Sequence, residues 1–197
     1  MCGIAGIMLT NGNIIEKSLL DEMANSIAHR GPDGKGHRIR RGVGIIQVRL
    51  AIIDLKDGDQ PLYGPHGDEG EALIANAEIY NYRELRGSMN QVLFKTNSDC
   101  EVALHLYLQY GIDFVRHLRG MYAIAIDDPS NERLVLARDP FGIKPLYYAE
   151  TQSGFIFGSE TSVFTKTGLI PAKILAERRD ELLQLKFTTG RNTPFEG

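Results

Sequence analysis

The sequence predicts an α+β fold in which antiparallel strands form most of the regular structure. Short apolar runs recur along the chain and are separated by Gly, Asp, Asn and Pro, a pattern typical of strands joined by turns. Two longer segments show helical periodicity instead, and strands and helices do not alternate regularly as in a parallel sheet. These three observations favour a layered α+β sandwich over a doubly wound sheet.

The expected strands are short and occur throughout the chain. They are the segments 3–9, 43–54, 71–80, 120–128, 133–139, 145–151 and 154–160.

Helices are expected where apolar residues recur every three to four positions. Residues 14–31 show this spacing on one face and stop at Gly31. Residues 97–111 repeat the pattern, with Ser98 or Asp99 as candidate N-caps. Shorter helices are expected at 82–86 and 114–118.

The composition is that of an ordinary globular domain. With 197 residues, 43% hydrophobic content and a net charge of −3, the chain suits one domain and carries no electrostatic footprint for nucleic acid or an anionic membrane. Cys2 and Cys100 are far apart and match no disulfide or metal spacing, which favours a reducing cytoplasm. The apolar run 4–9 is too short for a signal core or membrane span. We therefore expect a cytoplasmic protein.

Cys2 directly follows the initiator Met1. If Met1 is removed, one residue carries both a thiol and a free α-amine. The pKa of an α-amine is ~7.7–8.0, so a sizeable fraction is the free base at neutral pH. The plainer interpretation is a buried strand that contains a cysteine.

Several motifs occur together and in a fixed order. They are "CGIAGI", "RGPDG", "RLAIIDL", "NAEIYN", "NSDCE", "LRGMYAIAI", "ARDPFGIKPLYY" and "FGSE". In this order they resemble the class II (N-terminal-nucleophile) glutamine amidotransferase domain of the asparagine synthetases. The resemblance is clear from Cys2 to about Glu160 and weaker beyond.

The resemblance implies the N-terminal-nucleophile hydrolase fold, a four-layer αββα sandwich. It also implies that Met1 is removed and that the Cys2 thiolate attacks the side-chain amide of glutamine. The α-amine of Cys2 would carry the proton, and attack would yield ammonia and a glutamyl thioester that water hydrolyses.

The same resemblance assigns roles to further residues. Asn76, through its side-chain amide, and Ala77, through its backbone N–H, are expected to stabilise the oxyanion. Alanine stands where the family has glycine, so a required positive φ would add strain of about 1 kcal/mol. Arg49 is expected to bind the α-carboxylate of glutamine, and Asp99, with Glu78 nearby, its α-ammonium. Taken singly, these three would be a surface residue, a helix cap and a solvated strand end.

Other motif residues are expected to be structural. Gln47 replaces a histidine of the family pattern, and because glutamine can still bridge polar groups we expect a modest effect. Residues 30–34 are expected to form a wall or flap by the pocket. Arg138, Asp139 and Lys144 are expected to hold the fold rather than to act in catalysis.

The resemblance divides the chain into a glutamine amidotransferase domain, residues 2–165, and a charged helix and linker, residues 166–197, toward a synthetase domain. No "SGG(L/V)DS"-type loop occurs in the sequence. ATP and magnesium are therefore expected only for that synthetase domain, in cis or in trans, and this chain is expected to hold no cofactor or metal. The ammonia acceptor, aspartate or another carboxylate, stays open, as does a homodimer.

Two alternatives remain at this point. A degenerate, non-catalytic domain that binds glutamine or docks a partner would explain Ala77 and Gln47, but not Cys2. A glutaminase of another amidotransferase branch, making glucosamine phosphate or phosphoribosylamine, fits "RGPDG" and "RLAIID" less well.

Overall fold

Two antiparallel sheets form the centre of the molecule. The computed structural model describes residues 1–52, 54, 57–190 and 193–195. The first sheet has the order β2-β3-β1-β9-β8 and the second the order β4-β5-β6-β7. The strands of the first sheet are β1 Gly3–Leu9, β2 Gly34–Arg40, β3 Val43–Arg49, β8 Tyr147–Thr151 and β9 Gly154–Gly158. Those of the second are β4 Leu62–Tyr63, β5 Ala72–Ile79, β6 Gly120–Asp128 and β7 Arg133–Arg138.

The sheets pack face to face through a small apolar core. Alanines on β5 and β6 allow close approach, while β-branched residues and one aromatic ring fill the remaining space. The buried members of this core are Ile4, Val43, Ile45, Ala72, Ile74, Ala123, Ala125 and Phe157.

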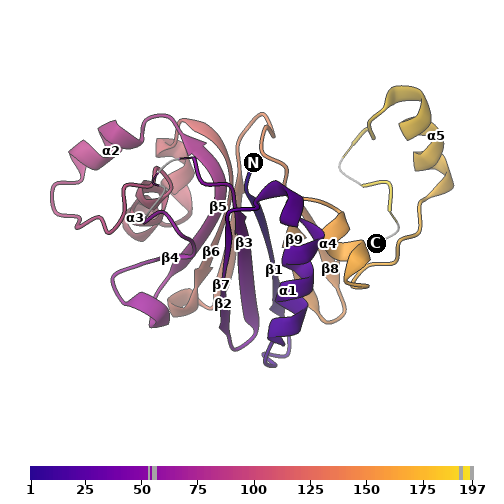
Figure 1. Ribbon diagram of the computed structural model, residues 1–197, viewed down its shortest axis with the longest axis horizontal. Coiled ribbons are helices and arrows are strands. Elements are labelled where there is room, and N and C mark those ends of the chain that lie inside the picture. The colour runs from indigo at the N-terminus through magenta and orange to yellow at the C-terminus, as the bar shows by residue number, and fades with distance from the viewer. Residues whose placement is uncertain (53, 55–56, 191–192, 196–197) are drawn as a thin grey trace.

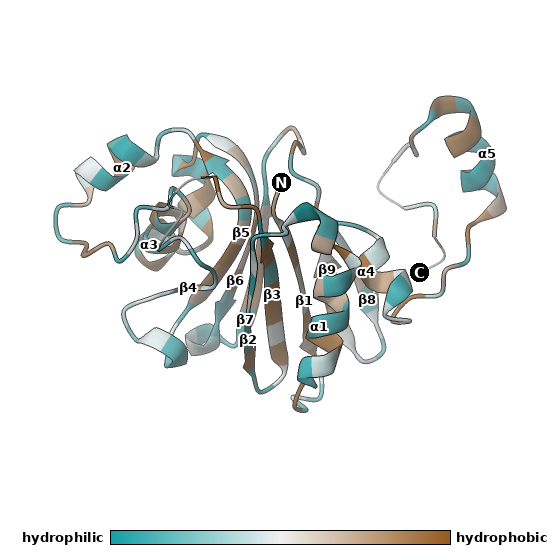
Figure 2. Cartoon of the chain, in the orientation of Figure 1, coloured by the Kyte–Doolittle hydropathy of each residue, from teal (hydrophilic) through white to brown (hydrophobic). Residues whose placement is uncertain are grey.

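Helices cover both outer faces. Helix α1 (Lys17–Ser26) and the short α4 (Ser162–Lys166) pack on the first sheet, and α3 (Glu101–Tyr110) packs on the second. Helix α2 (Tyr82–Ser88) lies beside α3 (Figure 1). Figure 2 shows the hydrophobic colour concentrated on the central strands and the hydrophilic colour on outward surfaces. The order helix, sheet, sheet, helix confirms the expected four-layer αββα sandwich.

Local details differ from the sequence expectations in three places. Helix α3 ends before Gly111, whose φ of +57° suits glycine, but its N-cap is Cys100 and makes no side-chain cap hydrogen bond. β2 is a full edge strand that the apolar pattern did not reveal, because its sequence "GKGHRIR" alternates glycine and charged residues. The expected strand 43–54 ends at Arg49; residue 53 lies outside the described residues.

The C-terminal helix lies outside the packed core of the sandwich. Helix α5 (Ala176–Leu185) has no buried residue, and Figure 1 shows it set apart from the sandwich. Among the described residues, no helix combines the length and the apolar character needed to cross a membrane.

Candidate active site

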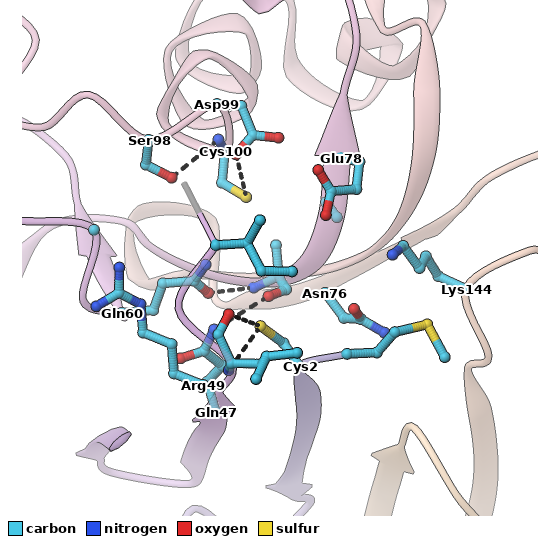
Figure 3. Close-up of a pocket in the computed structure, with 16 residues that line it drawn as sticks. Cys2, Gln47, Arg49, Gln60, Asn76, Glu78, Ser98, Asp99, Cys100 and Lys144 are labelled. Carbon is cyan, nitrogen blue, oxygen red and sulfur yellow. Dashed lines mark hydrogen bonds between the residues drawn. The ribbon is translucent and has the colours of Figure 1, made fainter. Parts of the chain in front are cut away.

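A pocket with a volume of about 60 Å³ lies at one end of the two sheets. Its walls come from the two residues before β1, the end of β3 and the loop that follows it, the second half of β5, the segment before α3 and the loop between β7 and β8 (Figure 3). The structure brings all the predicted site residues to this pocket: Cys2, Arg49, Asn76, Ala77, Glu78 and Asp99.

Cys2 is held at the pocket by its backbone and its sulfur. Its Sγ accepts a hydrogen bond from the Leu50 N–H at 3.3 Å. Arg30 donates from Nε to the Cys2 carbonyl at 3.0 Å, and Arg30 Nη1 pairs with Glu160 at 2.9 Å. Met1 lines the same pocket. Removing Met1 would therefore free the α-amine of Cys2 and widen the space beside the sulfur.

The expectation that residues 30–34 form a wall of this pocket is wrong. None of them lines it, and Arg30 reaches the site only through the Cys2 carbonyl. Residues 31–34 instead line a separate depression of about 250 Å³ beside α1. The segment has this other position because the Asp33 N–H bonds to the Arg49 carbonyl at 2.9 Å, on the outer side of β3.

β5 presents two donors to the pocket that have no hydrogen-bond partner among the described residues. Asn76 is 2% exposed, and its Nδ2 has no hydrogen-bond partner within the described residues. Ala77 is in register with Tyr122 of β6, but the Tyr122 carbonyl accepts from the Asp139 N–H at 2.8 Å, on the other edge of β6. The Ala77 N–H therefore points away from β6, toward the pocket edge of β5. Because an unpaired buried donor costs about 1–3 kcal/mol, both donors are suited to a negatively charged oxygen.

Alanine at position 77 carries no glycine-like strain. The described non-glycine residues with positive φ are Asp54, Glu132 and Lys186, so Ala77 is not among them. It lies within the regular pairing of β5 with β6. The strain considered for a glycine-only angle therefore does not arise in this chain.

Two glutamine side chains hold the residue before Asn76. The Ala75 N–H donates to Gln60 Oε1 at 2.6 Å, and Gln47 Nε2 donates to the Ala75 carbonyl at 3.4 Å. Gly36 allows this approach, because a Cβ there would lie 1.8 Å from the Gln60 carbonyl. Gln47 thus bridges polar groups as expected, while the contribution of Gln60 could not be read from the sequence.

Arg49 places a buried guanidinium at the end of β3. Its side chain is 10% exposed, and its Nη1 lies 2.7 Å from the carboxylate of Asp59, which is 81% exposed. Its Nη2 donates to the Asp54 carbonyl. Because the Asp59 side chain is mostly in water, this ion pair is weak and a substrate carboxylate could replace it.

Asp99 is not a helix cap but a buried carboxylate in the pocket wall. Its Oδ2 accepts from the Ile79 N–H at 2.7 Å, and within the described part of the chain no cation pairs with it. Burial raises the pKa of Asp99, although hydrogen bonds from the Ile79 N–H and other groups act in the opposite direction. Glu78, half-buried on β5, lines the same wall. Together they form an anionic side opposite Arg49 (Figure 3).

Lys144 has a position in the pocket wall that the sequence expectation did not include. Asp139 does hold the fold, since its carboxylate accepts from the backbone N–H groups of Tyr122, Ile143 and Lys144. The Lys144 side chain, however, lines the pocket. A lysine in the Pro- and Gly-rich "FGIKP" turn gave no sign of this, because a turn pattern does not show where a side chain points.

Comparison with known proteins identifies the chain. The model of the family described as "Glutamine amidotransferase domain" matches residues 1–197. The chain belongs to this glutamine amidotransferase family.

Individual relatives agree with the family match. Asparagine synthetase [glutamine-hydrolyzing] 2 of Bacillus subtilis is 44% identical over 81% of this chain and 22% of its own length. Amidase chry2 of Gibberella zeae is 36% identical over 96% of this chain and 30% of its own. The solved structure of the glutamine phosphoribosylpyrophosphate amidotransferase of B. subtilis has a TM-score of 0.70 at 25% identity, covering 85% of this chain and 44% of that one. The amidotransferase domain thus spans under a third of these curated relatives.

Proposed function

We propose that this domain hydrolyses L-glutamine to glutamate and ammonia through a thioester on Cys2. The observation that carries the proposal is the pocket itself. It combines the Cys2 sulfur with the unpartnered Asn76 Nδ2 and the Ala77 N–H on the free edge of β5. A nucleophile beside preorganised donors is the arrangement that acyl transfer requires.

In the proposed reaction, the Cys2 thiolate attacks the amide carbon of the glutamine side chain. The carbonyl electrons move to oxygen, where Asn76 and Ala77 donate hydrogen bonds. The α-amine of Cys2, freed by removal of Met1, takes up the thiol proton as the thiolate forms and then delivers it to the leaving nitrogen, so the C–N bond breaks and ammonia departs. Water then attacks the thioester, which releases glutamate and regenerates the thiol.

Substrate recognition is part of the same proposal. The Arg49 guanidinium binds the α-carboxylate in place of Asp59. Its planar group suits a carboxylate because two parallel N–H donors can reach the two carboxylate oxygens. Asp99, assisted by Glu78, binds the α-ammonium, which gives the buried Asp99 carboxylate the cationic partner that it lacks in the described structure.

The ammonia requires an acceptor, and we propose an ATP- and magnesium-dependent synthetase domain that works with this domain in cis or in trans. The glutamine-hydrolysing asparagine synthetases among the relatives support this choice. Aspartate is the first acceptor to test. Residues 166–197 are the proposed connection. Both cysteines are free thiols, which supports a reducing, cytoplasmic location. Whether the domain forms a homodimer is left open.

A non-catalytic glutamine-binding domain has no structural support in this pocket. Its two supporting features were Ala77 and Gln47. Ala77 is unstrained in β5, and Gln47 bonds to the Ala75 carbonyl.

The test is labelling with the glutamine affinity reagent 6-diazo-5-oxo-L-norleucine, read by intact mass after treatment with methionine aminopeptidase. We expect loss of Met1 and one adduct in the wild type. Cys100→Ala removes the other thiol of the pocket, which is buried, and is the matched control. This variant should keep the adduct, and Cys2→Ala should lose it. A processed wild type without an adduct, or an adduct that survives Cys2→Ala, would overturn the proposal.

A further inference from the structure

Lys144 has an environment unusual for a lysine. It is 3% exposed and lines the pocket, and within the described residues its Nζ has no hydrogen-bond or ion-pair partner. Lysine is almost never fully buried unless it is paired. A lysine whose chain is buried and whose ammonium faces a pocket, with no partner among the described residues, therefore requires an explanation other than packing.

The ammonium does not hold its own loop together. The Lys144 backbone is fixed at both ends, because its N–H donates to Asp139 Oδ2 at 3.0 Å and its carbonyl accepts from Arg138 Nε at 2.9 Å. Arg138 also donates to the Gly142 carbonyl at 2.8 Å. These contacts use the backbone of Lys144 and leave its side chain directed at the pocket.

Lys144 is not needed to bind the α-carboxylate or the α-ammonium group of the substrate. Arg49, Lys144, Glu78 and Asp99 are the charged side chains in the described pocket wall. A zwitterionic amino acid has one carboxylate and one ammonium, and Arg49 and Asp99 already match these two. No ion pair joins Lys144 to Glu78, although Figure 3 shows both directed into the same space.

We propose that Lys144 is a further catalytic residue of the glutaminase site, whose ammonium stabilises the oxyanion formed on the amide carbonyl. Cys2, Asn76 and Lys144 line the same pocket, and in the view of Figure 3 the Asn76 side chain lies between the other two. A fixed positive charge that faces a pocket can stabilise negative charge that develops there during the reaction. The inference rests on the proposed function and adds a cation to its oxyanion site.

The experiment compares steady-state glutamate release and thermal unfolding of the processed wild type, Lys144→Met and Lys144→Arg. Lys166→Met, at an exposed position on α4, is the matched control and should behave as wild type. For Lys144→Met we expect kcat to fall about 100-fold while KM changes less than about threefold. Its Tm should stay the same or rise, because the variant loses a charge from the pocket wall without breaking a hydrogen bond or ion pair among the described residues. Lys144→Arg should recover at least about tenfold of the lost kcat, because it restores the charge.

Other outcomes overturn the inference. A Lys144→Met variant with wild-type kcat, or with a lowered Tm or no folded state, would show that the side chain is structural. A Lys144→Arg variant as slow as Lys144→Met would show that charge is not what matters. A wild type that neither releases glutamate nor takes the affinity label would overturn the proposed function and this inference together, whereas an active wild type confines the failure to Lys144.

Discussion

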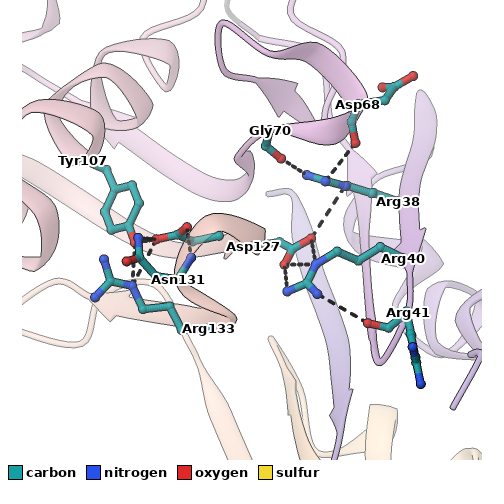
Figure 4. Close-up of polar contacts among 10 residues, drawn as sticks. Arg38, Arg40, Arg41, Asp68, Gly70, Tyr107, Asp127, Asn131 and Arg133 are labelled. Carbon is teal, nitrogen blue, oxygen red and sulfur yellow. Dashed lines mark hydrogen bonds and ion pairs between the residues drawn. The ribbon is translucent and has the colours of Figure 1, made fainter. Parts of the chain in front are cut away.

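The pocket and the Asp127–Asp128 cluster use buried polar groups in opposite ways. At the far end of β6, Asp127 is fully buried between Arg38 and Arg40, and Asp128 accepts hydrogen bonds from Tyr107, Asn131 and Arg133 (Figure 4). In the pocket, the buried Asn76 Nδ2 has no hydrogen-bond partner in the described structure, and Lys144 lines the wall without an ion pair to a described residue. Paired groups hold a fold together, while unpaired groups are stabilised only when a ligand arrives.

The two carboxylates that differ most in partners also differ in pKa. Burial raises the pKa of Asp99, which has no cation beside it. Burial acts in the same direction on Asp128, but hydrogen bonds from Tyr107, Asn131 and Arg133 outweigh it and lower the pKa. The contrast indicates that Asp128 stabilises the fold at neutral pH and that Asp99 costs stability there.

The largest effect on stability should follow a break in the paired cluster. Asp127→Ala leaves Arg38 and Arg40 without their carboxylate, which we expect to lower the free energy of unfolding by about 3–5 kcal/mol. The folded fraction should keep wild-type kcat and KM, since the cluster is remote from the pocket. Denaturant unfolding measures the first value and glutamate release the second.

The control for this change is Asp113→Ala, which removes an exposed ion pair with Arg116 and should cost at most about 1 kcal/mol. Equal destabilisation by the two variants would contradict the interpretation of Asp127 as a paired structural group.

A change to the unpaired donor should have the opposite profile. Asn76→Leu keeps a similar volume but removes Nδ2, so we expect kcat to fall about 10²–10³-fold, equivalent to ~2.7–4 kcal/mol. Because the lost amide nitrogen has no partner to leave behind, unfolding should require no less denaturant than in the wild type. A variant that loses stability but retains kcat would reverse the roles that we assign to the two regions.

Particular residues show which parts of the fold and of the site could be predicted from the sequence. The strand and helix patterns, and the residues that reach the pocket, could be predicted because periodicity and motif order depend on local sequence. β2 was missed because its faces carry glycine and charge instead of apolar residues. The pocket positions of Gln60 and Lys144 were missed because they depend on where a loop directs a side chain. Gln60 is positioned by a close approach to Gly36, which is distant in the sequence. Lys144 is positioned by a hydrogen bond to Asp139, which belongs to another part of the same turn.

Asp99→Asn should give the smallest of the three effects. The pH dependence of its thermal stability gives the most direct comparison of the pocket with the Asp127–Asp128 cluster. The amide keeps an oxygen for the Ile79 N–H but loses the charge that binds an ammonium, so KM for glutamine should rise roughly 10- to 100-fold. Because the folded-state pKa of Asp99 is raised, its contribution to stability is present at low pH and is lost as the pH rises through that pKa.

Asp99→Asn should therefore unfold at a higher temperature than the wild type at neutral pH, and the difference should shrink as the pH falls toward ~3.9, the ordinary pKa of aspartate. Asp128→Asn should show the reverse sign, because the lowered pKa of Asp128 gives stability that is present at neutral pH and lost on acidification. Thermal unfolding of both variants from pH 4 to 8 measures this difference. Two curves with the same sign would mean that the pocket carboxylate is paired in the folded protein, and that its wall is built for stability rather than for an incoming ammonium group.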